Sequence, residues 1–103
     1  MRKITEESVN AFLNAKKFNK SNMTVEVEPN VTILKYHGNA IAYKYNDKKT
    51  RAITNCGWET NTTKERLNGV IILAGLNIEP IYQKNWQWYL GGKLWNGNLI
   101  DIN

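Results

Sequence analysis

The sequence predicts an α+β fold: a single compact domain, residues 1–103, in which two helices accompany an antiparallel sheet of short strands, a meander plus a C-terminal hairpin. A chain of 103 residues has room for one hydrophobic core. Its composition, 42% hydrophobic and 22% charged, is typical of a folded globular protein. From Met23 onward the apolar residues change from helical spacing to strict alternation, and turn residues recur at short intervals.

The first helix is expected at residues 5–17. Thr5 can accept amide hydrogen bonds of the first turn, and Lys16-Lys17 suits the negative C-terminal end of the helix dipole. Val9 and Phe12 share one face at helical spacing. We therefore expect a helix that packs by one face on a sheet.

Residues 23–55 are predicted to form a meander of four short strands. Apolar and polar residues alternate from Met23 until Pro29-Asn30 makes a turn. Two runs rich in β-branched and aromatic residues follow, and their connection at His37-Gly38-Asn39 is a hairpin signal. The polar segment 46–49 then leads into the fourth strand.

The second helix is expected at residues 62–75. Thr62 and Glu65 have the spacing of a capping box, and Gly75 can adopt the left-handed conformation that ends a helix. Gly69 inside the helix costs about 1 kcal/mol relative to Ala. Close packing against a neighbouring element would explain its presence.

The C-terminal segment predicts a hairpin that carries aromatic residues. An extended run ends at Gln83, a polar break follows at Lys84-Asn85, and two further runs are joined by Gly91-Gly92. Trp86 and Trp88 are two residues apart, so we expect them on one strand face. They are predicted to form an aromatic surface that binds a partner.

Charge and cysteine content restrict the kind of partner and the compartment. The net charge of +5 and the pI near 9.4 favour anionic partners such as nucleic acid or nucleotides, although ordinary soluble proteins carry similar charge. A single cysteine cannot form an internal disulfide, which fits a reducing cytoplasm. No signal peptide and no membrane-spanning apolar run is evident, so we expect a cytoplasmic protein without a membrane partner.

The sequence predicts no catalytic residues, no metal site and no cofactor. His37 is the only histidine and Cys56 the only cysteine, so neither a site with several imidazoles nor a thiolate cluster can form. A Cys56 nucleophile with His37 as its base is the alternative, but neither residue lies in a local signature that supports the pair. Acidic residues are scattered, and there is no phosphate-binding loop. We therefore expect a binding protein and not an enzyme.

The stretch Ile53–Val70 contains the candidate ligand site. The free amides and the dipole of a helix N-terminus attract anions, and hydroxyl, amide and basic side chains surround it. A structural interpretation competes, because the same residues are sufficient to cap the helix and the Trp ring can fill the core beneath the loop. The candidate ligand-binding residues are Trp58, Thr60, Asn61, Thr63, Lys64 and Arg66.

The same stretch resembles small proteins encoded by tailed bacteriophages. The resemblance consists of Gly57-Trp58, then Thr62-Thr63-Lys64, then Arg66-Leu67-Asn68 at the start of a helix, with a fainter likeness in the aromatic ending Trp88–Gly97. It implies an accessory phage protein that binds a host factor, sequesters a nucleotide or coats nucleic acid.

We therefore expect a protein that interferes with a host factor or a defence system, with a nucleotide or nucleic acid as the favoured ligand. The alternative is a protein inhibitor that contacts a host enzyme through its aromatic surface. The sequence leaves open whether the chain forms a homo-oligomer.

Overall fold

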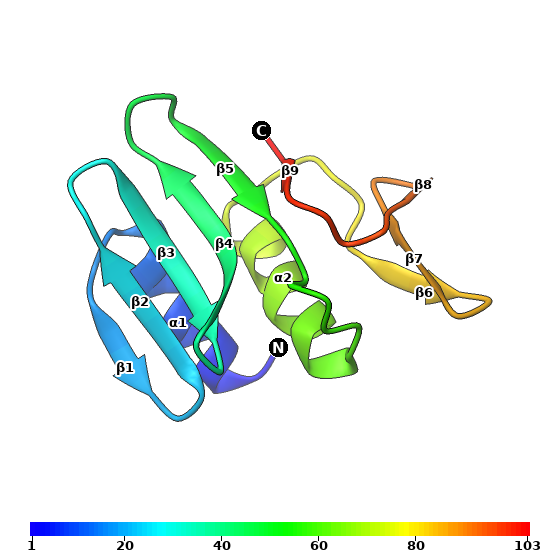
Figure 1. Cartoon of the computed structure of the whole chain (residues 1–103), viewed down its shortest axis with the longest axis horizontal. Coiled ribbons are helices and arrows are strands. Elements are labelled where there is room, and N and C mark those ends of the chain that lie inside the picture. The colour runs from blue at the N-terminus through cyan, green and yellow to red at the C-terminus, as the bar shows by residue number, and fades with distance from the viewer.

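A computed structural model describes residues 1–103 and confirms the α+β class (Figure 1). Six strands form one antiparallel sheet in the order β1-β2-β3-β4-β5-β9, and three form a second antiparallel sheet in the order β6-β7-β8. The short strands β1 and β9 extend the predicted meander at its two edges. The elements in chain order are α1 (Lys3–Leu13), β1 (Phe18–Lys20), β2 (Met23–Val27), β3 (Val31–Tyr36), β4 (Asn39–Tyr45), β5 (Thr50–Ile53), α2 (Asn61–Leu73), β6 (Tyr82–Lys84), β7 (Gln87–Leu90), β8 (Lys93–Leu94) and β9 (Ile100–Asp101).

Alternation along the strands gives the six-stranded sheet one buried face. Val25 pairs with Leu34, Leu34 with Ala42, and Ala42 with Ile53, so one row of buried apolar residues crosses four strands. Side chains in strands point alternately to the two faces, so the sequence pattern directs this row to the core.

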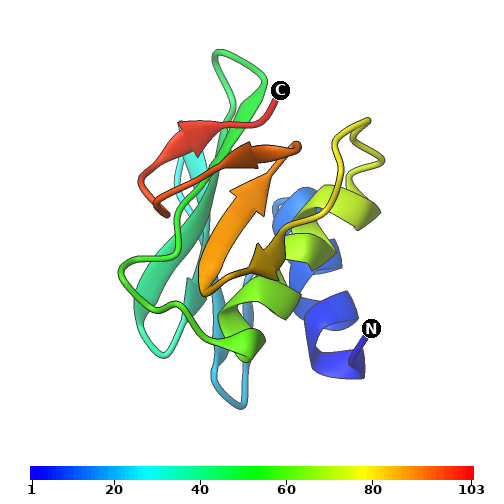
Figure 2. The same cartoon turned by 90° about the vertical axis from the view of Figure 1, so that its right-hand side faces the viewer.

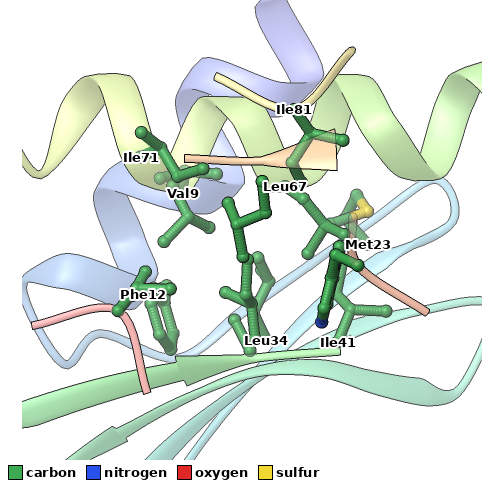
Figure 3. Close-up of a cluster of buried hydrophobic side chains, with 14 of the residues drawn as sticks. Val9, Phe12, Met23, Leu34, Ile41, Leu67, Ile71 and Ile81 are labelled. Atoms are coloured by element: carbon green, nitrogen blue, oxygen red, sulfur yellow. The ribbon is translucent and has the colours of Figure 1, made fainter. Parts of the chain in front are cut away.

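Both helices cover this buried face. α1 packs on β1 to β3, and α2 lies beside α1 and reaches β4. Seen edge-on, the sheet has both helices on the same side (Figure 2). Between the layers Figure 3 shows the buried side chains Val9, Phe12, Met23, Leu34, Ile41, Leu67, Ile71 and Ile81.

The small sheet is fixed to α2 and to the core. The Asn68 side chain on α2 accepts from the Ile81 amide at 2.6 Å and donates to the Ile81 carbonyl at 3.0 Å. Trp88 and Trp95 are both buried, with ring centroids 6.2 Å apart. These contacts hold the β6–β7 hairpin in a defined position at one end of the molecule (Figure 1).

α1 begins and ends earlier than predicted, and Thr5 is not its cap. Arg2 is the N-cap residue and makes no side-chain cap hydrogen bond, whereas Thr5 is buried within the helix. At the other end Ala15 adopts φ +53°, and the Lys16 amide donates to the Ala11 carbonyl at 2.9 Å. This backbone arrangement ends the helix, so Lys16-Lys17 lies beyond it.

α2 ends at Leu73, two residues before its predicted end, and Gly75 follows with φ +67°, the left-handed conformation expected of it. Neither helix has the length and hydrophobicity needed to cross a membrane.

Gly69 allows α2 to approach α1 closely, as expected. A Cβ placed on Gly69 would lie 2.5 Å from Thr5 Cγ2 and 3.4 Å from Val9 Cγ2. Both contacts belong to α1, so the absence of a side chain at Gly69 sets the spacing of the two helices.

Gly69→Ala should lower stability. Overpacking costs about 1 to 3 kcal/mol, which exceeds the roughly 1 kcal/mol gained in helix propensity. Adding Thr5→Ser removes the clashing methyl group while it keeps the hydroxyl, so the double variant should recover most of the loss. Urea unfolding of the wild type, both single variants and the double variant measures this coupling. A Gly69→Ala protein as stable as the wild type would contradict the close approach.

Candidate functional site

The N-terminus of α2 is capped by Thr60, which corrects the capping box predicted at Thr62 and Glu65. Thr60 has extended backbone angles, and its hydroxyl accepts from the Thr63 amide at 3.2 Å. The Glu65 carboxylate does not return to the backbone of Thr62. It leaves the helix and accepts hydrogen bonds from the Thr5 hydroxyl and, at 3.2 Å, from the Arg2 amide.

Arg66 is 1% exposed and forms the centre of a buried polar network. Its Nη1 atom lies 2.6 Å from Glu65 Oε1 and 2.7 Å from Thr5 Oγ1. Its Nε atom lies 3.3 Å from the Met23 sulfur, and its guanidinium lies 5.8 Å from the centre of the Tyr36 ring. A buried cation requires such partners, so the network is structural.

The network also sets the ionisation of Glu65. Burial raises the pKa of the carboxyl. The hydrogen bonds from Thr5, the Arg2 amide and Arg66, together with the Arg66 charge, outweigh burial and hold the pKa below its ordinary value. The ionised form of Glu65 is therefore the form that stabilises the fold.

The structure separates the six candidate ligand-binding residues into two groups. Thr63 and Arg66 are buried and face the core. The other four lie at the surface around the start of α2: Trp58, Thr60, Asn61 and Lys64. Of the two predicted cations, only Lys64 is available to a ligand. Anion binding by the surface residues stays a prediction.

Trp58 is 52% exposed, which overturns the expectation that its ring fills the core. Asn55 holds the loop before α2. Its backbone amide donates to the Gly97 carbonyl at 3.1 Å, and its side-chain Oδ1 accepts from the Gly57 backbone amide at 2.8 Å. A Cβ on Gly97 would overlap the Asn55 side chain. The Asn55 carbonyl also accepts from the Trp58 amide at 2.8 Å. A well-anchored loop therefore presents the ring to solvent.

Trp86 and Trp88 do not share a strand face, so the prediction of a surface made by both is wrong. Trp86 is 89% exposed, whereas Trp88 is 2% exposed. Asn85 and Trp86 form the two-residue connection of the β6–β7 hairpin, with φ of +52° and +66°. A connection with two positive φ values is a type I′ turn, in which strand alternation no longer applies.

Three hollows surround the first turn of α2. The first, about 500 Å³, is lined by Lys64, Gln83, Asn85 and Trp86. The second, about 330 Å³, includes Met1, Asn61, Lys64 and Ile72, and the third, about 330 Å³, includes Trp58, Thr60 and His37. Lys64 lines two of them, and Thr60 and Asn61 are neighbours in the chain. We call this region the tryptophan surface and define it as Trp58, Thr60, Asn61, Lys64, Ile72 and Trp86.

The Cys56 thiol has no feature of an activated nucleophile. Its Sγ atom donates to the Ala40 carbonyl at 2.7 Å, and burial raises its pKa. The protonated thiol is the less reactive form. His37 lies in the β3–β4 turn with φ +51°, its ring 4.6 Å from that of Tyr36. No three acidic, His or Cys side chains come together as a metal site would require.

Thr60→Ala should destabilise the protein by about 1 kcal/mol because it removes the cap acceptor. Thr62→Ala changes a residue with no capping bond, so it should stay within about 0.5 kcal/mol of the wild type. Chemical unfolding of both variants distinguishes the two positions. A larger loss of stability in Thr62→Ala than in Thr60→Ala would show that Thr62 is the cap.

Acid should weaken the Glu65 network. Since the folded-state pKa of Glu65 lies below its unfolded value, the ionised carboxylate stabilises the fold above the unfolded value, and this contribution is lost as pH falls through the folded pKa. Glu65→Gln should therefore be less stable than the wild type at neutral pH, and the gap in Tm should narrow as the pH falls below the ordinary carboxyl range. Glu59→Gln, at an exposed carboxylate, is the control. A gap that is constant with pH would disprove the role of the ionised form.

Comparison with known proteins identifies the family and confirms the predicted phage resemblance. No curated protein and no solved structure matches the chain. The chain matches the family described as Kyanoviridae Gp96 protein over residues 1–100. Because this match spans almost the whole chain, the protein belongs to the Kyanoviridae Gp96 family of phage proteins.

Proposed function

We propose that this phage protein acts by binding a host protein through the tryptophan surface and interferes with that host factor in the cytoplasm of the infected cell. The observation that carries the proposal is the conformation of Trp86, whose large apolar ring is almost fully exposed at a positive φ. Protein partners are the class of ligand for which such a ring is suited, because Trp is enriched among the residues that dominate binding energy.

The stability of the fold does not explain why a Trp occupies position 86. The second position of a type I′ turn favours Gly, and a bulky residue there costs about 1 to 3 kcal/mol. The ring is 89% exposed and so recovers little of this cost by burial. A partner that covers the ring would offset this conformational cost, because Trp buries a large apolar area on binding.

The surroundings of Trp86 favour a protein over an anion. Seven of the eight exposed large hydrophobic side chains lie in residues 54–103. The same segment contains four basic and four acidic residues, so it carries no net charge. An excess of positive charge, which this segment lacks, would favour an anionic ligand. Glu65 lines a hollow next to Lys64, which lowers the local positive potential further.

Trp86→Gly should strongly weaken partner binding without damaging the fold, because Gly suits the turn and the lost ring has few contacts to the protein. A host protein recovered from lysate on the immobilised wild type is purified, and its Kd is measured for each variant. We expect affinity to fall by about 30-fold or more, the loss typical of a dominant interface residue. Trp58→Ala should weaken the same complex.

Asn85→Gly is the matched control, since it changes the same turn and keeps the ring. Its affinity should equal that of the wild type. Light scattering should show a monomer. A dimer that dissociates in Trp86→Gly, or a partner bound equally by Trp86→Gly, would refute the proposal.

A further inference from the structure

A basic hollow at the end of the β4–β5 hairpin lies outside the tryptophan surface. It has a volume of about 220 Å³ and is lined by Lys44, Tyr45, Asn46, Lys49 and Arg51. No acidic residue lines it, and none of its three cations forms an ion pair. The nearest acidic residue in the chain, Asp47, accepts a hydrogen bond from the Lys48 amide in the turn.

Strand register brings the cations together. Lys44 pairs directly with Arg51 across β4 and β5. Lys49 lies in the turn that joins these two strands, where its φ is +54°. Lys44 Nζ donates to the Leu13 carbonyl at 2.7 Å, which leaves two of its three donors unused. Arg51 Nε is buried and has no hydrogen-bond partner. Burial and the adjacent Arg51 charge lower the pKa of Lys44, as expected for cations held together without a counter-ion.

We propose that the hollow lined by Lys44, Lys49 and Arg51 binds a phosphate group of a single-stranded nucleic acid. Lysine and arginine donors converging on one small volume match the charge and the acceptor oxygens of a phosphate. A bound phosphate would also offset the repulsion between Lys44 and Arg51.

The adjacent sheet face explains why a nucleic acid strand fits better than a free ion. Lys44 reaches α1, so its neighbours Tyr43 and Tyr45 point to the opposite face, which no helix covers (Figure 2). Their rings are parallel, with centroids 6.0 Å apart, and Lys48 Nζ lies 5.5 Å from the centre of the Tyr45 ring. Tyr45 also lines the hollow, so the pair of rings begins at its rim. Aromatic rings next to a basic groove are the usual elements of single-strand binding.

The distribution of charge supports the same ligand. Residues 1–53 contain ten basic and five acidic residues, so the whole net charge of +5 lies in the half of the chain that carries the hollow. This proposal is independent of the tryptophan surface, and Trp86→Gly should bind nucleic acid like the wild type.

Titration of the ¹⁵N-labelled protein with an oligothymidylate and with inorganic phosphate at low salt tests the proposal. The amide signals of residues 44–51 should shift with both, and the oligothymidylate should bind more tightly. Lys49→Asn, which suits a positive φ, and Arg51→Gln should each weaken oligothymidylate binding and reduce the salt dependence of log K by about 0.7. Lys3→Gln, at the far end of α1, removes an equal charge. It should change neither the affinity for the oligothymidylate nor the salt dependence of log K.

No binding of either probe, or shifts confined to other residues, would overturn the proposal. So would equal weakening by Lys3→Gln, which would indicate diffuse attraction. Phosphate that binds as tightly as the oligothymidylate would overturn the assignment to a strand. The wild-type shifts locate the site even if a variant fails to fold.

Discussion

The buried guanidinium of Arg66 constrains the arrangement of the helices. A cation that is 1% exposed is tolerated only when its donors are satisfied, and its partners come from several parts of the chain. Glu65 adjoins it on α2, Thr5 belongs to α1, and Met23 begins β2. Movement of α1 relative to α2 would break the bond to Thr5 and leave a buried charge with fewer partners. The polar network therefore fixes the register of two helices, while Gly69 permits their close approach.

Local sequence patterns predicted the fold well, because alternation and turn chemistry are properties of short segments. The β3–β4 hairpin at His37-Gly38 and the left-handed Gly75 that follows α2 are examples. The site was predicted less completely. Several neighbouring hydroxyls precede α2, so sequence spacing could not distinguish Thr60 from Thr62 as the cap. The burial of Arg66 depends on a residue 61 positions earlier, and no local pattern reports such a contact.

The molecule separates its charge from its exposed apolar residues. The six-stranded sheet is built mainly from the half of the chain that carries all the net positive charge, whereas residues 54–103 carry seven of the eight exposed large hydrophobic side chains. Two surfaces of different chemistry therefore lie on one small scaffold. Asn68 contributes to this division, because its paired hydrogen bonds to Ile81 hold the small sheet to α2 without a continuous strand ladder.

The lengths of the outermost strands have a consequence for solubility. β1 has three residues and β9 has two, so each edge of the six-stranded sheet offers few unpaired backbone groups to another molecule. Lys20 adds a charged side chain at one edge, where it pairs with Glu7 of α1 at 3.1 Å. Short and charged edge strands resist edge-to-edge association. The brevity of its two edge strands therefore protects the sheet against growth by addition of further strands.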